Sequence, residues 1–189
     1  MKLKKILNEQ ATQYDVRLIK LTDTEGLQQF ADFYNESGQL TWALTPARLK
    51  QKVGSKGKLW GLYPSGSDQL VGTIGLKVVQ STSDADLGEI GYVMVATEHR
   101  SLQNIMKLFK VVLAKARRFD AVYITTNVKN RVINKLLDRT PKAEKILMVK
   151  SPFGGGQNKL FVYMVTTSAS PQKRQLITDY FSEYTISEF

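Results

Sequence analysis

LGEIGYVMVATEHRSLQNIMKLFKVVLAKARR, residues 87–118, is the stretch that decides the fold. Leu87 to Ala96 is apolar, rich in β-branched side chains and of strand length. A short polar break at Thr97 and Glu98 follows. Apolar side chains then recur at helical spacing: Leu102, Ile105, Met106, Phe109, Val112, Leu113 and Ala116. The stretch therefore predicts a strand, a tight turn and a long amphipathic helix, whose first free N–H groups and positive dipole end favour a phosphate group.

The rest of the chain adds strands and helices on both sides of this stretch. The predicted strands are residues 15–21, 58–63, 69–80, 87–96, 121–126, 145–150 and 159–167, and the predicted helices are 27–38, 46–53, 102–116, 131–138 and 171–184. Strands two to four are expected to form an antiparallel meander. Residues 121–126 lack polar alternation, which predicts a buried strand parallel to its predecessor. The order βααβββαβαββ with a C-terminal helix indicates an α/β (α+β) fold with a single mixed, mostly antiparallel sheet flanked by helices.

Length and composition predict one domain with two short extensions. The 189 residues, 42% of them hydrophobic, suffice for one well-buried core. We expect a basic N-terminal segment over residues 1–14, the domain over 15–167 and a helical tail over 168–189. The apolar stripe of that tail could pack on its own domain or on a second copy in a homodimer. Glycines 72, 75 and 91 within strands indicate bulges or close backbone approach.

Composition also excludes several kinds of site. The chain has no cysteine and one histidine, His99, which argues against disulfides, thiolate nucleophiles and a metal site. The basic N-terminus lacks the apolar core of a signal peptide, and no run reaches transmembrane length. We therefore expect a cytoplasmic protein without a membrane partner.

The net charge of +10 is the strongest compositional signal, with 27 Lys and Arg against 17 Asp and Glu. A field of this sign attracts anions, so nucleic acid or another polyanion is one expected class of partner. The alternative is that the charge serves solubility alone.

Residues 89–95, followed by Glu98-His99-Arg100 at a helix start, resemble the central acyl-CoA-binding segment of the GNAT N-acetyltransferase superfamily. The resemblance covers about residues 15–167, and it implies an acyl-CoA N-acyltransferase-like fold in which strands 87–96 and 121–126 diverge at their carboxyl ends. It also implies acetyl-CoA as the cofactor. The backbone of Val93, Met94 and Val95 would then bind the pantetheine arm.

The family's pyrophosphate-binding turn, Arg/Gln-x-x-Gly-x-Gly/Ala, corresponds here to residues 100–105, RSLQNI. The resemblance assigns cofactor contacts to Arg100, Ser101, Gln103, Asn104, Asn127 and Asn130. Gln103 and Ile105 replace the two family glycines, and we expect their side chains to crowd the phosphate cradle and weaken binding. Residues 136–137, Leu-Leu, also lack the tyrosine that protonates the leaving thiolate in many members.

Glu89 is the candidate catalytic residue. In many family members a carboxylate at this place of the strand acts as general base, directly or through water, and an N–H group within residues 93–95 would stabilise the oxyanion. The alternative for Glu89 is an ordinary ion pair with a Lys or Arg. His99 is expected to face solvent or phosphate rather than act in catalysis. Trp42 is expected to pack in the protein interior rather than line the groove in which family members bind the acceptor substrate.

Two functions follow from these residues. The first is acetyl transfer from acetyl-CoA to the amine of a small molecule or a protein, with weakened cofactor binding. The alternative is a degenerate, non-acetylating GNAT-like protein that binds or modifies nucleic acid through its basic surface.

Overall fold

The computed structural model describes residues 13–36, 43–82, 85–151, 158–165 and 170–189. Trp42 lies outside these residues. The strands are β1 (Tyr14–Ile19), β2 (Lys58–Pro64), β3 (Gly72–Ser81), β4 (Asp86–Val95), β5 (Ala121–Asn127), β6 (Ala143–Lys150), β7 (Lys159–Val165) and β8 (Thr185–Glu188). The helices are α1 (Thr24–Glu36), α2 (Pro46–Val53), α3 (Leu102–Ala116), α4 (Arg131–Asp138) and α5 (Pro171–Tyr180), with 3-10 turns at Thr97–His99 and Ser182–Tyr184.

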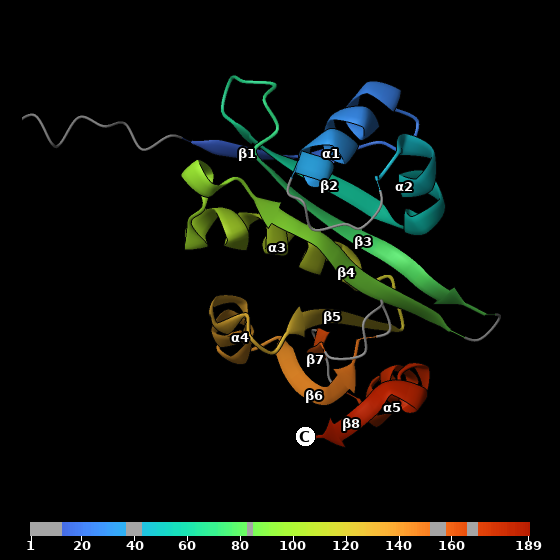
Figure 1. Ribbon diagram of the computed structural model, residues 1–189. Coiled ribbons are helices and arrows are strands. Elements are labelled where there is room, and N and C mark those ends of the chain that lie inside the picture. Colours follow the sequence, from blue (N-terminus) through green and yellow to red (C-terminus); the bar gives the residue numbers. More distant parts are fainter. Residues whose placement is uncertain (1–12, 37–42, 83–84, 152–157, 166–169) are drawn as a thin grey trace, which may run out of the picture.

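The described strands form one sheet in the order β1-β2-β3-β4-β5-β7-β6-β8. Of the pairs between described strands, only β4–β5 is parallel, and its register runs from Leu87–Ala121 to Ile90–Ile124. Beyond that point the two strands diverge (Figure 1). The predicted fold class, element order and parallel pair are therefore confirmed.

Helices cover both faces of the sheet. Helix α3 packs on the face formed by Trp60, Ile74 and Ile90, in the same apolar cluster as Leu137 of α4. Helices α1 and α2 pack against Leu59 and its neighbours on the other face. Leu59, Gly75 and Gly91 are aligned partners across β2, β3 and β4. They therefore lie on the same face of the sheet as α1 and α2. We call this side the groove face.

Two helix starts are fixed by side-chain N-caps. The Thr45 side chain accepts from the Arg48 N–H at the start of α2, and that of Ser170 accepts from the Lys173 N–H at the start of α5. Each cap is followed by proline at the first helical position.

The predicted helix over residues 171–184 is wrong at its end. Helix α5 stops at Tyr180, and after a 3-10 turn the chain forms β8, which pairs with β6 along its free edge. Strand β8 has only four residues, so its alternating pattern is a weaker signal than the apolar helical stripe that precedes it. The sequence therefore predicts that the helix continues. Ile177 and Phe181 pack against the groove face with Leu87 and Tyr123, so the tail covers its own sheet.

We expect Phe181→Ala to lower the free energy of unfolding by ~3–5 kcal/mol, because the ring is only 2% exposed and its loss leaves a cavity under α5. Val132→Ala, at a side chain that is 73% exposed, should change it by less than about 0.5 kcal/mol. Urea unfolding followed by circular dichroism measures both. Equal small effects would contradict the docking of the tail on the sheet.

Candidate functional site

The divergence of β4 from β5 begins at a bulge in β4. Thr73 pairs with Met94 and Gly75 with Gly91, so that two residues of β4, at 92 and 93, face one residue of β3. Tyr92 has a φ of +54°, which a tyrosine rarely adopts. The Thr73 hydroxyl donates to the Tyr92 carbonyl at 2.8 Å. The bulge turns the carboxyl end of β4 away from β5 and leaves that edge without a strand partner.

Val93, Met94 and Val95 lie on the part of β4 that has no partner in β5. On its other edge this segment still pairs with β3, through Met94 and Thr73. The Val95 carbonyl accepts the Arg100 Nη2 at 3.2 Å and Nε at 3.4 Å. Arg100, a predicted phosphate ligand, therefore folds back onto a backbone group at the strand end.

The turn between β4 and α3 is held by its own polar side chains. Ser101 is the N-cap of α3, and its hydroxyl accepts the Asn104 N–H at 3.1 Å. The buried Asn104 side chain donates to the His99 carbonyl at 2.8 Å. Asn104 thus orders the turn with its side chain, whereas Gln103 is exposed beside it.

The expectation that Ile105 crowds the phosphate cradle is wrong. Its side chain is 9% exposed and packs in the apolar cluster beneath α3, because it falls on the buried stripe of that helix. Of the two residues that replace glycines, only Gln103 borders the surface pocket at the start of α3.

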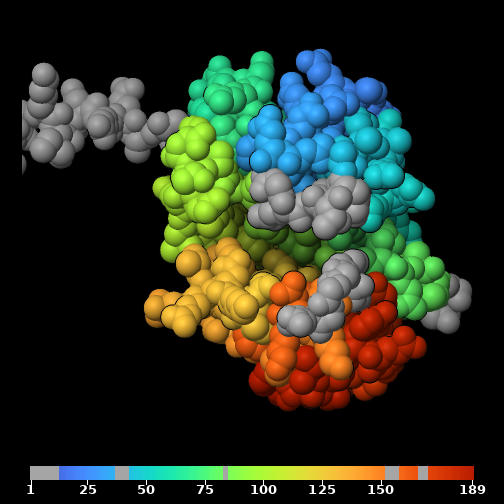
Figure 2. Space-filling model, in the orientation of Figure 1, coloured from blue at the N-terminus to red at the C-terminus, as the bar shows by residue number. Residues whose placement is uncertain are grey.

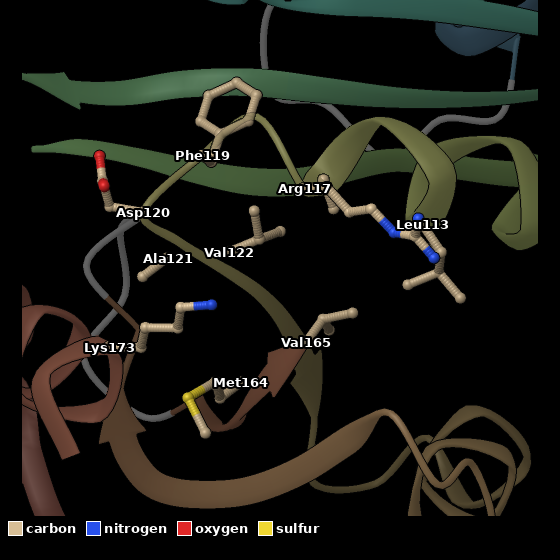
Figure 3. Close-up of a pocket in the computed structure, with 10 residues that line it drawn as sticks. Leu113, Arg117, Phe119, Asp120, Ala121, Val122, Met164, Val165 and Lys173 are labelled. Carbon is tan, nitrogen blue, oxygen red and sulfur yellow. The ribbon is translucent and has the colours of Figure 1, made fainter. Parts of the chain in front are cut away.

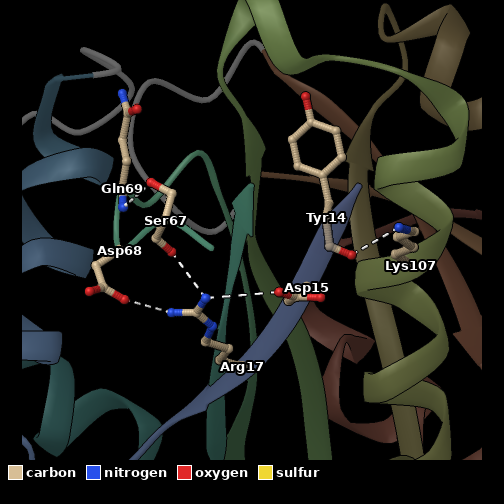
Figure 4. A network of polar contacts seen from close by, with 7 residues as sticks. All are labelled: Tyr14, Asp15, Arg17, Ser67, Asp68, Gln69 and Lys107. Atoms are coloured by element: carbon tan, nitrogen blue, oxygen red, sulfur yellow. Dashed lines mark hydrogen bonds and ion pairs between the residues drawn. The ribbon is translucent and has the colours of Figure 1, made fainter. Parts of the chain in front are cut away.

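That pocket lies between the start of α3 and β1. Its lining residues are Gln13, Tyr14, Glu98, His99, Arg100, Ser101, Gln103, Asn104 and Lys107. His99 Nδ1 lies 2.9 Å from the Tyr14 hydroxyl, and the side chain is partly buried. Lys107 donates to the Tyr14 carbonyl at 2.9 Å (Figure 4). Histidine, arginine and lysine therefore surround the first turn of α3, next to the strand end.

Asn127 and Asn130 serve the backbone of their own junction. The Asn130 side chain accepts the Ile133 N–H and caps α4, and that of Asn127 accepts the Lys129 N–H. A third asparagine of this junction, Asn134, was not predicted from the sequence. It is 7% exposed, bonds to the Thr126 hydroxyl and donates to the carbonyls of Asn127 and Val128. An asparagine within the apolar stripe of α4 was the sequence signal that could have indicated it.

Glu89 lies on the groove face and is 8% exposed. Its carboxylate forms an ion pair with Lys77, with Nζ 2.7 Å from Oε2. Lys77 is its direct partner across β3 and β4, so the ion pair considered for Glu89 exists, and the lysine that forms it was not identified from the sequence. The Lys77 ammonium also lies 5.3 Å from the centre of the Tyr92 ring.

Tyrosines surround this ion pair. Burial raises the pKa of the Tyr34, Tyr92 and Tyr123 hydroxyls, and the nearby Glu89 charge raises each further. Side-chain hydrogen bonds to Tyr180 and Glu89 add to the effect on the Tyr123 pKa. The phenols therefore stay protonated and can donate hydrogen bonds at neutral pH. Figure 2 shows the surface hollowed between the part built by α1 and α2 and the part built by β6, β7 and α5, with β4 at its floor.

A separate cavity lies at the opposite end of β5, where Ala121 and Val122 begin the strand (Figure 3). Its volume of about 20 Å³ is close to the space that one water molecule needs. It is too small for a cofactor or an acceptor, so the bulge and the groove remain the candidate site.

No protein family model and no curated protein sequence matches the chain. Solved structures do match. The NatC complex bound to Gag peptide and CoA aligns with a TM-score of 0.65 at 14% identity, over 82% of this chain and 99% of that one. The ribosomal-protein-S18-alanine N-acetyltransferase of Escherichia coli aligns with a TM-score of 0.60 at 9% identity, over 84% and 98%.

The chain has the GNAT fold. A further GNAT structure, Arabidopsis thaliana NAA60 in complex with acetyl-CoA, aligns with a TM-score of 0.62 at 16% identity, over 82% of this chain and 99% of that one. Identities this low establish the fold alone. Among the described residues, no cluster of His, Asp and Glu could hold a metal ion, and no helix has the length and apolarity to span a membrane.

Proposed function

We propose that this chain is an acyl-CoA-dependent N-acyltransferase that transfers an acetyl group to an amine. The observation that carries the proposal is the placement of Glu89 four residues before Val93, so that a buried carboxylate and the unpaired end of β4 share one strand. The titles of the matching structures, several of them N-acetyltransferases and one with acetyl-CoA, support it.

The backbone fits acetyl-CoA at the strand end. The unpaired edge over Val93 to Val95 offers main-chain groups for a pantetheine arm, and the first turn of α3 offers N–H groups beside Arg100 for a pyrophosphate. Acetyl-CoA would supply an activated acetyl thioester there. Arg100 must then leave the Val95 carbonyl, to which it donates in the structure, so cofactor binding competes with an internal contact.

Glu89 is proposed to take a proton from the acceptor amine, and a backbone N–H of the bulged segment to stabilise the oxyanion. Lys77 keeps the Glu89 carboxylate paired in the absence of an acceptor. Leu137, where the family often has tyrosine, is 2% exposed and carries no proton donor, so the departing thiolate takes its proton from water. The acceptor is a small-molecule amine or a protein amine that enters the groove of Figure 2.

We expect Glu89→Gln to lower kcat by ~10²–10⁴-fold and to leave the Kd for acetyl-CoA nearly unchanged, because the amide keeps the shape but cannot accept the proton. Steady-state acetyl transfer to a panel of amines and calorimetric titration with acetyl-CoA measure the two quantities. Glu144→Gln is the matched control, since Glu144 is an exposed carboxylate paired with Arg174 at 3.0 Å. A wild-type protein that neither binds acetyl-CoA nor acetylates any amine would refute the proposal.

We expect Gln103→Gly to tighten acetyl-CoA binding by about tenfold, the effect of one added hydrogen bond of ~1.5 kcal/mol to a charged group, because phosphate could then approach the helix start. Both Gln103 and Gln172 stand two residues after a serine N-cap, in α3 and α5 respectively, so Gln172→Gly has the same helix cost of about 1 kcal/mol. Calorimetry compares the two variants. Equal tightening by both would show that the cradle is not at Gln103.

A second candidate function rests on exposed cations of α4. Arg131 and Lys135, together with the C-cap Arg139, follow one another at four-residue intervals and are all exposed, so they form one basic stripe. Such a stripe suits the phosphates of a nucleic acid. For this function, wild-type protein should bind an oligonucleotide with an affinity that falls steeply between about 50 and 200 mM salt, while binding no acetyl-CoA.

A further inference from the structure

Lys77 places a primary amine beside the proposed base. Its Nζ lies 2.7 Å from Glu89 Oε2, and the two side chains are 19% and 10% exposed. The face of the Tyr92 ring lies 5.3 Å from the same ammonium. These are the contacts that an alkylammonium acceptor would need before it gives up a proton. Lys77 therefore occupies a position suited to the acceptor amine of the proposed reaction.

The lysine stem points along the floor of the groove toward the bulge. A Cβ atom at Gly91 would lie 3.0 Å from Lys77 Cε and 3.3 Å from Nζ, so the end of the lysine crosses over Gly91. Gly91 directly precedes the bulged Tyr92, where β4 loses its β5 partner. Val93 is two residues further along, about 7 Å in a strand. The four-carbon stem of a lysine is flexible, so Nζ can change its position over Gly91.

We propose that the protein acetylates its own Lys77 from acetyl-CoA, an inference that rests on the proposed acyltransferase function. The Lys77 ammonium gives one proton to Glu89, and the free amine attacks the thioester carbonyl carbon. The C–N bond of the amide forms and the C–S bond breaks. The second proton leaves the nitrogen for water, water protonates the departing thiolate to give the CoA thiol, and Glu89 returns its proton to water.

The modification would change the charge of the groove. Acetylation removes the ammonium, so Lys77 can no longer form an ion pair with Glu89. Glu89 would keep its carboxylate without its cationic partner at the floor of the site. Lys77 acetylation is therefore a means by which the enzyme alters its own acceptor groove.

Lys56 provides a matched control within the same chain. It also pairs with a carboxylate, Asp86, at 2.6 Å, but its side chain is 57% exposed, and its partner lies at the start of β4, away from the bulge. General chemical acetylation should therefore favour Lys56 over the less exposed Lys77. A reaction directed by the site should reverse that preference.

The test uses the full-length protein with isotope-labelled acetyl-CoA, and with acetic anhydride in the absence of acetyl-CoA, followed by peptide mass spectrometry. We expect acetyl-CoA to label Lys77 at least tenfold faster than Lys56 and acetic anhydride to label Lys56 faster. The acetyl-CoA rate at Lys77 should not depend on protein concentration, and Glu89→Gln should lower it by ~10²–10⁴-fold. Lys77→Arg, which keeps a cation beside Glu89, should carry no label at that position.

Three outcomes would overturn the inference. Acetyl transfer to added amines with Lys77 unlabelled would remove self-acetylation and leave the proposed function intact. Equal labelling of Lys77 and Lys56 by acetyl-CoA would mean chemical acetylation only. The absence of both acetyl-CoA binding and acetyl transfer would remove the inference together with the function on which it rests.

Discussion

The left-handed conformation of Tyr92 is the constraint on which the site depends. A side chain in this region costs about 1–2 kcal/mol relative to an ordinary strand conformation. The Tyr92 ring makes edge-to-face contacts with Phe30 and Tyr34, with ring centres 5.7 and 5.3 Å away, and each contact contributes ~0.5–1.5 kcal/mol. Gly75 makes room, because a Cβ there would lie 2.9 Å from the ring. Packing under α1 thus offsets the strain that frees the end of β4.

The same packing connects the groove of Figure 2 to the strand end. Helix α1 supplies the rings that hold the bulge, and α5 covers the neighbouring part of the groove face next to Tyr123. Glu89 lies between these two covered areas, which explains why it is buried and yet borders the groove. A change in how α1 or α5 packs would therefore alter both the floor of the groove and the divergence of β4 from β5.

The fold could be predicted because its signals are local. Apolar periodicity marked the helices, and the compact strand after α3 indicated the parallel pair. Strand β8 was missed because its pairing depends on the free edge of β6, which no local pattern reveals. Glycines 72, 75 and 91 indicated a bulge in this region, but its centre is Tyr92, since the neighbouring glycines give the ring and Lys77 their space.

The candidate site was predictable in part. Glu89 and the segment from Val93 to Val95 stand where the resemblance places them, although their roles remain proposals. The partner of Glu89 could not be named, because it depends on the register between β3 and β4 and the chain has 27 lysines and arginines. Burial of Ile105, by contrast, agrees with the apolar stripe of α3, whereas the family pattern alone suggested that it would face the phosphate.

The Lys77–Glu89 pair also limits what the groove can accept. Breaking a largely buried ion pair by removing one partner leaves an uncompensated charge, which is costly. An incoming ammonium can replace Lys77 beside Glu89 with little change in charge, whereas a neutral or anionic ligand would leave the carboxylate unpaired. In the proposed reaction, the pair would favour cationic amines over other acceptors at close range, even though the net charge of +10 disfavours their approach from a distance. Because salt screens long-range repulsion more than a buried contact, this balance shifts toward cationic acceptors as ionic strength rises.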